Sequence, residues 1–278
     1  MKKALFLLLP LISLTSLNAQ YYYQDVIVTN EITQRMATLN REKVRSITAT
    51  GYDQRGAKSS DFNEWQDVLE NGRLLKVTSR NGTVVERHYY SFDEEGKLVS
   101  LRDSARGIET ITKYSYASPG VLTNVSMKVN DSLQEFSKTE ERRWIYDANG
   151  RLVSMLRIVN GTDSSTYNFK VDEAGNVIEE QLYRITQSAE PMYYYYDEDR
   201  RLTDVVRYHK ILKRLLPDFM FEYDENDNVI QRISVVSATN SEYVTWRYIY
   251  DSRGLKTKDV LFDKEKRMSG RIDYAYSF

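Results

Sequence analysis

A short turn motif that returns at regular intervals constrains this chain more than any other feature of its sequence. The motif is clearest as Tyr146-Asp147-Ala148-Asn149-Gly150, and gap-free copies lie at residues 52–56, 92–96, 171–175, 196–200, 223–227 and 250–254. Degenerate copies at residues 68–72 and 116–120 complete the series, so that the last position of the motif recurs every 24 to 30 residues from Gly72 onward. A period of this length indicates an array of one supersecondary unit.

Each copy has the residue chemistry of a hairpin loop. Asp at the first turn position accepts hydrogen bonds from backbone N–H groups ahead of it, and Gly at the last takes the left-handed conformation that closes a type I turn. The residues before the turn alternate in character, as in Trp144-Ile145-Tyr146, which is typical of a strand. A Leu or Val two residues after the motif opens the return strand, as at Leu74, Leu98, Leu152, Val177, Leu202 and Val229. Each unit therefore predicts two antiparallel strands.

The number of units decides the fold class. Second turns, between units, are expected at Asn81-Gly82, Asn130-Asp131, Asn160-Gly161 and Lys264-Glu265-Lys266. Nine units imply about sixteen to eighteen strands, more than the roughly ten that an open twisted sheet tolerates before it curls or splits. We predict an all-β protein: a long antiparallel meander of repeated hairpins, coiled into an open or closed barrel-like sheet. Two stretches fit less well: residues 30–39 have the spacing of a short helix, and residues 205–216 are interpreted as a strand with a longer loop ending at Pro217.

The turn also predicts which residues share a face of the sheet. If Asp147 and Arg151 flank the loop, Tyr146 lies opposite Leu152 and Trp144 opposite Ser154, so the aromatic residues and the Leu/Val position form the core face. The opposite face is expected to be wet, with the charged residues Arg143, Lys170, Glu222, Arg247, Arg157, Glu180, Arg207 and Arg232.

The N-terminus has the pattern of a secretory signal. Lys2 and Lys3 precede an apolar stretch from Ala4 to Leu14, and Ala19 is a suitable last residue before cleavage. We therefore expect a signal peptide over residues 1–19, a single β domain over residues 20–278, and export to the periplasm, the cell surface or the medium. The apolar stretch is too short for a spanning helix, which needs about 20 residues.

The amino-acid composition limits the kinds of covalent, metal-binding and catalytic site that the chain can form. There is no Cys and there are two His, which excludes disulfides, thiolate metal sites and Cys nucleophiles. A net charge of −1 argues against a nucleic-acid partner. Asp224, Asn226 and Asn228 imitate the start of a calcium loop, but Val229 stands where such a loop needs Gly, so these residues are interpreted as a turn. We expect no cofactor and no metal site.

The pattern Tyr-Asp-x-x-Gly-Arg-Leu, seen at residues 146–152, resembles the YD repeats of the RHS family, which occur in bacterial secreted and surface proteins. The resemblance covers about residues 50–278. It implies a spiralling β-sheet, with a role in adhesion or carbohydrate binding, and it is nearest to the small secreted YD-repeat proteins of Bacteroidota. We expect no effector domain, and the chain is too short to enclose another domain.

These features favour a non-enzymatic, exported protein of the cell envelope that presents a binding or scaffold surface to a glycan or a protein partner. Two alternatives stay open. Tyr274, Tyr276 and Phe278 alternate up to a terminal Phe, as in outer-membrane β-barrels, although charges occur on both predicted faces. An envelope hydrolase would have to use His88 or His209, and no Ser or Asp stands at a spacing that suggests a triad. For glycan stacking, the candidate residues are Tyr89, Tyr193, Tyr195 and Phe262.

Overall fold

The computed structural model describes residues 20–117, 120–183, 190–209, 212–237 and 242–278; the expected signal sequence, residues 1–19, lies outside them. The described chain begins with a π-helical segment, η1 (Tyr22–Ile27), that continues directly into helix α1 (Val28–Arg41). Strands make up most of the remainder: β1 (Ser46–Asp53), β2 (Lys58–Leu69), β3 (Leu74–Asn81), β4 (Val84–Phe92), β5 (Leu98–Ala105), β6 (Ile108–Ala117), β7 (Val121–Asp131), β8 (Phe136–Tyr146), β9 (Leu152–Val159), β10 (Asp163–Val171), β11 (Val177–Tyr183), β12 (Met192–Tyr196), β13 (Leu202–His209), β14 (Arg214–Tyr223), β15 (Val229–Ser237), β16 (Glu242–Tyr250), β17 (Lys256–Phe262) and β18 (Met268–Ser277). No helix within these ranges is both long enough and apolar enough to cross a membrane.

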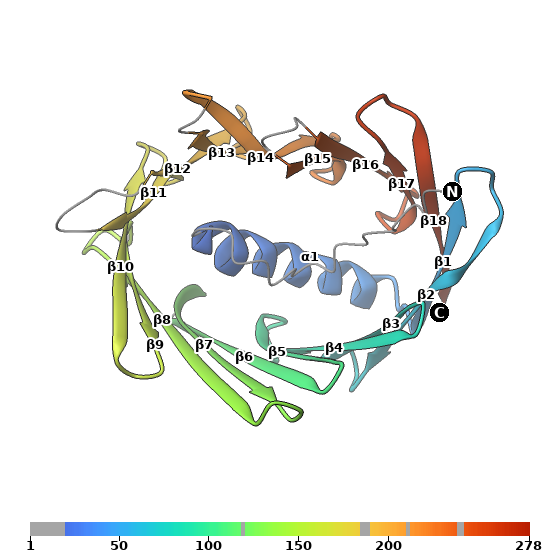
Figure 1. The fold of residues 1–278 in the computed structure, drawn as a ribbon, viewed down its shortest axis with the longest axis horizontal. Helices are drawn as coiled ribbons and strands as arrows, with labels where there is room; N and C mark the ends of the chain where they lie inside the picture. The colour runs from blue at the N-terminus through green and yellow to red at the C-terminus, as the bar shows by residue number, and fades with distance from the viewer. Residues whose placement is uncertain (1–19, 118–119, 184–189, 210–211, 238–241) are drawn as a thin grey trace.

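The strands form one closed antiparallel barrel. Each strand pairs with its neighbours in sequence, and β18 pairs with β1 from Ser46 opposite Ser277 to Asp53 opposite Gly270. Figure 1 shows the ring of strands closing where the red C-terminal strand meets the blue β1. The prediction of an all-β meander of hairpins is confirmed, and of the two forms left open by the sequence the barrel is the closed one, which leaves the sheet without a free edge.

A β-bulge follows the repeat turn and shifts the register by one residue. Tyr146 lies opposite Leu152 as predicted, but Ile145 lies opposite Ser154 and Trp144 opposite Met155, because Val153 is an extra residue in the return strand. The same shift occurs after the turns that precede Leu98, Leu122, Val177, Leu202, Val229 and Lys256. The predicted pairing of Trp144 with Ser154 is therefore wrong, and Ser154 points away from the core.

The barrel interior is filled by helix α1 and by the aromatic residues of the strands. Figure 1 shows α1 enclosed by the ring of strands. The helix predicted at residues 30–39 is thus confirmed and longer, and its Ile32, Met36 and Leu39 are buried in the same cluster as Trp144 and Leu152. Burial of these apolar side chains between helix and sheet is the main stabilising contribution. The predicted core face is the inner face of the barrel.

Two predicted turns need correction, and the turn predicted at Lys264-Glu265-Lys266 is confirmed in its position. Pro217 lies inside β14, at a bulge opposite Val206, and does not end a loop. Asn130 and Asp131 are the last residues of β7, and the turn follows them. Residues 263–267 form a repeat-type turn, since the Asp263 carboxylate accepts the backbone N–H of Arg267; like the turn at residues 53–57, it lies at the barrel end opposite to the turn at residues 147–151.

Candidate functional site

Charged residues inside the barrel hold the N-terminal segment in place. The Glu180 carboxylate, from β11, accepts backbone N–H groups of Tyr21 at 3.0 Å and Tyr22 at 3.1 Å, and the Tyr194 hydroxyl donates to it at 2.6 Å. An anion is favourable at the start of a helix, where backbone N–H groups have no partner within the helix. Glu180 is only 1% exposed, and burial raises its pKa to about 7.

A second cluster ties the helix to β8 and β9. Arg142 donates to both carboxylate oxygens of Asp25, from Nε at 2.7 Å and from Nη2 at 3.0 Å, and its Nη1 donates to Glu140 at 2.8 Å. Arg157 Nη2 donates to the other oxygen of Glu140 at 2.7 Å. Burial would lower the pKa of Arg142, but Asp25 and Glu140 outweigh it and raise that pKa, so the guanidinium stays charged. A third contact joins the Gln20 amide to Asp218, which also pairs with Arg207 Nε at 2.9 Å.

These contacts overturn part of the predicted wet face. Arg157, Glu180, Arg207 and Arg232 were expected outside, and each faces the interior, because the bulge after the turn moves the return strand by one residue. Arg232, for example, lies opposite the buried residues Phe221 and Trp246. The sequence contains the information needed to predict this inward orientation. If the residue after the Leu/Val position of each return strand is treated as an unpaired bulge residue, these four charged residues are assigned to the inner face.

The two histidines lie far apart and differ in surroundings. His88 Nδ1 lies 2.5 Å from Asp103 Oδ1, across the β4–β5 pair, and its side chain is 18% exposed. Burial lowers the pKa of His88, but the hydrogen bond to Asp103 and the charges of Asp103, Glu86 and Glu64 outweigh burial and raise it. His209 ends β13 and accepts the backbone N–H of Leu212. Among the described residues, no hydroxyl is hydrogen-bonded to the His88 ring.

The outer face of the barrel is charged along its length. Lys170 on β10 pairs with Glu179 on β11 at 2.8 Å, and two pairs lie within single strands: Glu141 with Arg143 at 2.9 Å on β8, and Arg271 with Asp273 at 3.2 Å on β18. A chain of hydrogen bonds also runs from Arg247 through Gln231 to Glu222. These side chains alternate with the buried aromatic residues along the same strands, and the outer face also exposes apolar residues such as Ile145 and Ile249.

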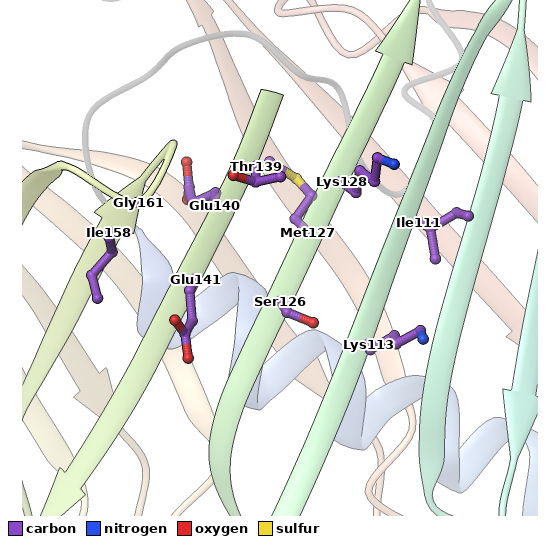
Figure 2. A pocket seen from close by; sticks show the side chains of 10 residues that line it. All are labelled: Ile111, Lys113, Ser126, Met127, Lys128, Thr139, Glu140, Glu141, Ile158 and Gly161. Carbon is purple, nitrogen blue, oxygen red and sulfur yellow. The ribbon is translucent and has the colours of Figure 1, made fainter. Parts of the chain in front are cut away.

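A hollow of about 420 Å³ lies on the outer face over β6 to β9. Figure 2 shows it with α1 behind the strands. One row across the strands is Lys113, Ser126, Glu141 and Ile158, and the next is Ile111, Lys128 and Thr139. Met127 and Glu140 lie between the two rows along β7 and β8, but both face the barrel interior, where Glu140 binds Arg142. The volume falls within the range of small-molecule sites, about 300–1,000 Å³. The sequence reasoning missed this site, because it singled out aromatic residues and these side chains are not aromatic.

The aromatic candidates for glycan stacking lie on the outer face but are not brought together. Tyr193 and Tyr195 are neighbours on β12, Tyr89 is on β4 beneath Arg102 at 4.3 Å, and Phe262 ends β17 beside Arg247 at 5.2 Å. No strand of one site is paired with a strand of another, so they form three separate places on the barrel.

The loop that imitates a calcium site is a hairpin turn. Asp224 Oδ1 accepts the backbone N–H groups of Asn226 and Asn228, each at 2.9 Å, as Asp147 does for Asn149 and Arg151. Within the ranges that the structure describes, no group of three or more His, Asp or Glu side chains is arranged to hold a metal ion.

Comparison with known proteins gives structural likeness only. No protein-family model matches the chain, and no curated protein matches it. A porin-like protein from Bacteroides uniformis aligns over 84% of this chain and 98% of its own, with 10% identity and a TM-score of 0.43. A porin-like protein from Bacteroides vulgatus aligns over the same shares with 13% identity and a TM-score of 0.29. The TcdB2-TccC3 complex aligns over 78% of this chain and 16% of its own, with 13% identity and a TM-score of 0.30. At these TM-scores the likenesses carry no argument about function.

Proposed function

We propose that this chain is an exported, non-enzymatic β-barrel of the cell envelope that works in water and presents its outer face as a binding or scaffold surface. The observation that carries the proposal is the distribution of polarity. The interior holds the apolar cluster and the chain's own helix, and the outer face holds ion pairs such as Lys170 with Glu179. A closed barrel filled in this way has its chemistry available only at its outer surface and its rims.

The repeat and the N-terminus support the rest of the proposal. In this meander every second connection between strands lies on the same rim of the barrel. YD-like turns, such as those at residues 147–151 and 172–176, lie on that rim, in keeping with a repeat protein of the secreted YD type. The signal-like residues 1–19 support export. The partner would be a glycan or a protein of the envelope, because nearly balanced charge does not favour nucleic acid.

An outer-membrane β-barrel is the second candidate, and one observation favours it: the sheet is closed, as a membrane-spanning sheet must be. Two others oppose it. Lys or Arg facing lipid at the bilayer midplane costs about 2–4 kcal/mol each, and Arg102, Lys113 and Arg247 face outward. The terminal aromatic residues Tyr274 and Tyr276 turn their hydroxyls inward, to Asp259 and to the Lys256 carbonyl oxygen.

The two candidates are separated by the behaviour of residues 20–278 in buffer. We expect the protein to stay monodisperse without detergent in analytical ultracentrifugation and not to float with lipid vesicles. Recovery only in detergent, or flotation with vesicles, would overturn the water-soluble barrel in favour of the membrane one. The binding role is tested separately, by cross-linking in the native envelope and by a glycan array. If no partner is cross-linked and no glycan gives a signal, the binding role is contradicted.

A further inference from the structure

We propose that the hollow over β6 to β9 binds an acidic saccharide, with Lys113 and Lys128 as the residues that recognise its negative groups. This proposal rests on the proposed function, since it names the class of ligand that the outer face would bind.

The first argument is the charge left over in the hollow. Both lysine side chains are exposed, and within the described part of the chain neither forms an ion pair. Some outer-face cations are paired, such as Lys170 with Glu179 and Arg271 with Asp273, whereas Lys258 on β17, like the two lysines of the hollow, forms no ion pair within the described residues. The carboxylate of the hollow, Glu141, is held by Arg143 Nε and Nη2 at 2.9 Å each. The hollow therefore carries two unneutralised positive charges, which complement an anion.

The second argument is the arrangement of the other lining groups. Lys113 lies opposite Ser126, and Lys128 lies opposite both Ile111 and Thr139. The two lysines are thus diagonal neighbours on adjacent strands, with Cα atoms about 7–8 Å apart. The hydroxyls of Ser126 and Thr139 flank them and can both donate and accept hydrogen bonds. Ile111 and Ile158 supply apolar surface at either side.

This combination fits a sugar that carries an acid group better than other small anions. A pyranose ring offers hydroxyls to Ser126 and Thr139 and C–H groups to the isoleucines, while its carboxylate or sulfate reaches an ammonium group. A simple inorganic anion would use only the lysines and would leave the apolar surface uncovered. A neutral saccharide would leave both charges without a partner. Carboxylated and sulfated saccharides share the required chemistry, so the experiment must distinguish them.

The test is isothermal titration calorimetry on residues 20–278 with three oligosaccharides of similar length: an oligogalacturonate, a heparin-derived fragment and maltohexaose. We expect heat of binding with at least one acidic oligosaccharide and none with maltohexaose, and weaker binding at higher salt. In Lys113→Gln/Lys128→Gln, loss of two charge-assisted hydrogen bonds should weaken binding at least about tenfold. The matched control is Lys258→Gln, an exposed outer-face lysine on β17, which should bind like the wild type.

Thermal melting of each variant checks that it is folded, and surface lysine substitutions should leave the melting curve in place. The heparin-derived fragment carries sulfate in addition to carboxylate groups, so equal affinity for the two acidic oligosaccharides would show that carboxylate suffices, and a preference for the heparin fragment would show that its sulfates or its higher charge contribute. Absence of binding by both acidic oligosaccharides at millimolar concentration would overturn the proposal, as would equal binding by the double variant or equal binding of maltohexaose. If the protein is soluble and cross-links to an envelope partner but the titration is negative, the hollow is not a saccharide site. The proposed role of the outer face as a binding surface would then still stand.

Discussion

The tyrosine before five of the repeat turns, and Tyr276 near the C-terminus, has a specific hydrogen-bond partner that accounts for part of the high Tyr content of this chain. Its hydroxyl donates to the carbonyl oxygen at the Leu/Val position of the preceding unit. The pairs are Tyr116 with Leu98, Tyr146 with Leu122, Tyr196 with Val177, Tyr223 with Leu202, Tyr250 with Val229 and Tyr276 with Lys256. The bulge interrupts the regular ladder beside these positions, and the hydroxyl gives a carbonyl near it a partner. Tyrosine thus serves both as an inward aromatic and as a hydrogen-bond donor.

The substitution Tyr146→Phe tests this account at a single residue. It keeps the ring and removes the 2.9 Å hydrogen bond to the Leu122 carbonyl oxygen, so the free energy of unfolding should fall by about 1 kcal/mol. Urea unfolding followed by fluorescence measures the change. Tyr52→Phe is the control, because the Tyr52 hydroxyl has no hydrogen bond among the described residues and its ring lies under Arg271 at 4.4 Å. Equal loss in both variants would mean that the hydroxyl of the repeat position has no special role.

At the scale of elements, the sequence predicts the hairpins well and the pairing across them less well. Alternation in Trp144-Ile145-Tyr146 and the Asp147 turn are local properties, so strands, turns and the inward aromatic face follow from them. The one-residue bulge depends on how the turn and the two strands twist together, which the local sequence does not specify. Because the bulge was not predicted, Arg157 and Glu180 were assigned to the outer face, whereas they face the interior. If the residue after Leu98 is treated as an unpaired bulge residue, the register of β4 and β5 places Asp103 opposite His88. The closing pair β1–β18 joins residues from both ends of the chain, and nothing local to residues 46–53 indicates it.

The pairing of helix and barrel through Asp25 and Arg142 gives a prediction at this scale. Asp25→Asn keeps the size of the side chain but leaves the buried Arg142 with Glu140 as its only carboxylate partner, so the free energy of unfolding should drop by about 1.5–3 kcal/mol. Denaturant unfolding at neutral pH measures it. The matched control is Glu141→Gln, the residue next to Glu140 on β8, which faces outward and whose exposed ion pair with Arg143 should contribute at most about 1 kcal/mol.

A double variant separates the ion pair from the packing. Replacing Asp25 and Arg142 together by Leu and Met removes both charges, and it should cost less than the sum of the two single replacements. If the single and double effects simply add, Asp25 and Arg142 do not stabilise the fold as a pair.

For the whole molecule, the consequence of placing a carboxylate inside the barrel is a dependence of stability on pH. Glu180 has an ordinary pKa of 4.5 and a folded pKa of about 7, raised first by burial and lowered only in part by its hydrogen bonds from Tyr194, Tyr22 and Tyr21. Between these two values the folded protein holds a proton that the unfolded chain has lost. The protein is therefore most stable below pH 4.5 with respect to this group, and it loses stability as pH rises toward 7. The raised pKa corresponds to about 3 kcal/mol over that window.

Glu180→Gln tests this coupling between the barrel and the N-terminal segment, because an amide does not titrate. The variant should lose stability at low pH, since one of the two backbone N–H groups of Tyr21 and Tyr22 loses its acceptor. The free energy of unfolding of the variant should not decline with rising pH as that of the wild type does. The difference in free energy of unfolding between the two proteins should therefore change by about 3 kcal/mol between pH 4.5 and 7. Glu179→Gln, one residue away on the outer face and paired with Lys170, should keep the wild-type slope. Parallel curves for wild type and Glu180→Gln across this window would show that the carboxylate is already ionised in the barrel at pH 4.5 and that the positive end of the helix, together with its amide donors, outweighs the cost of burial.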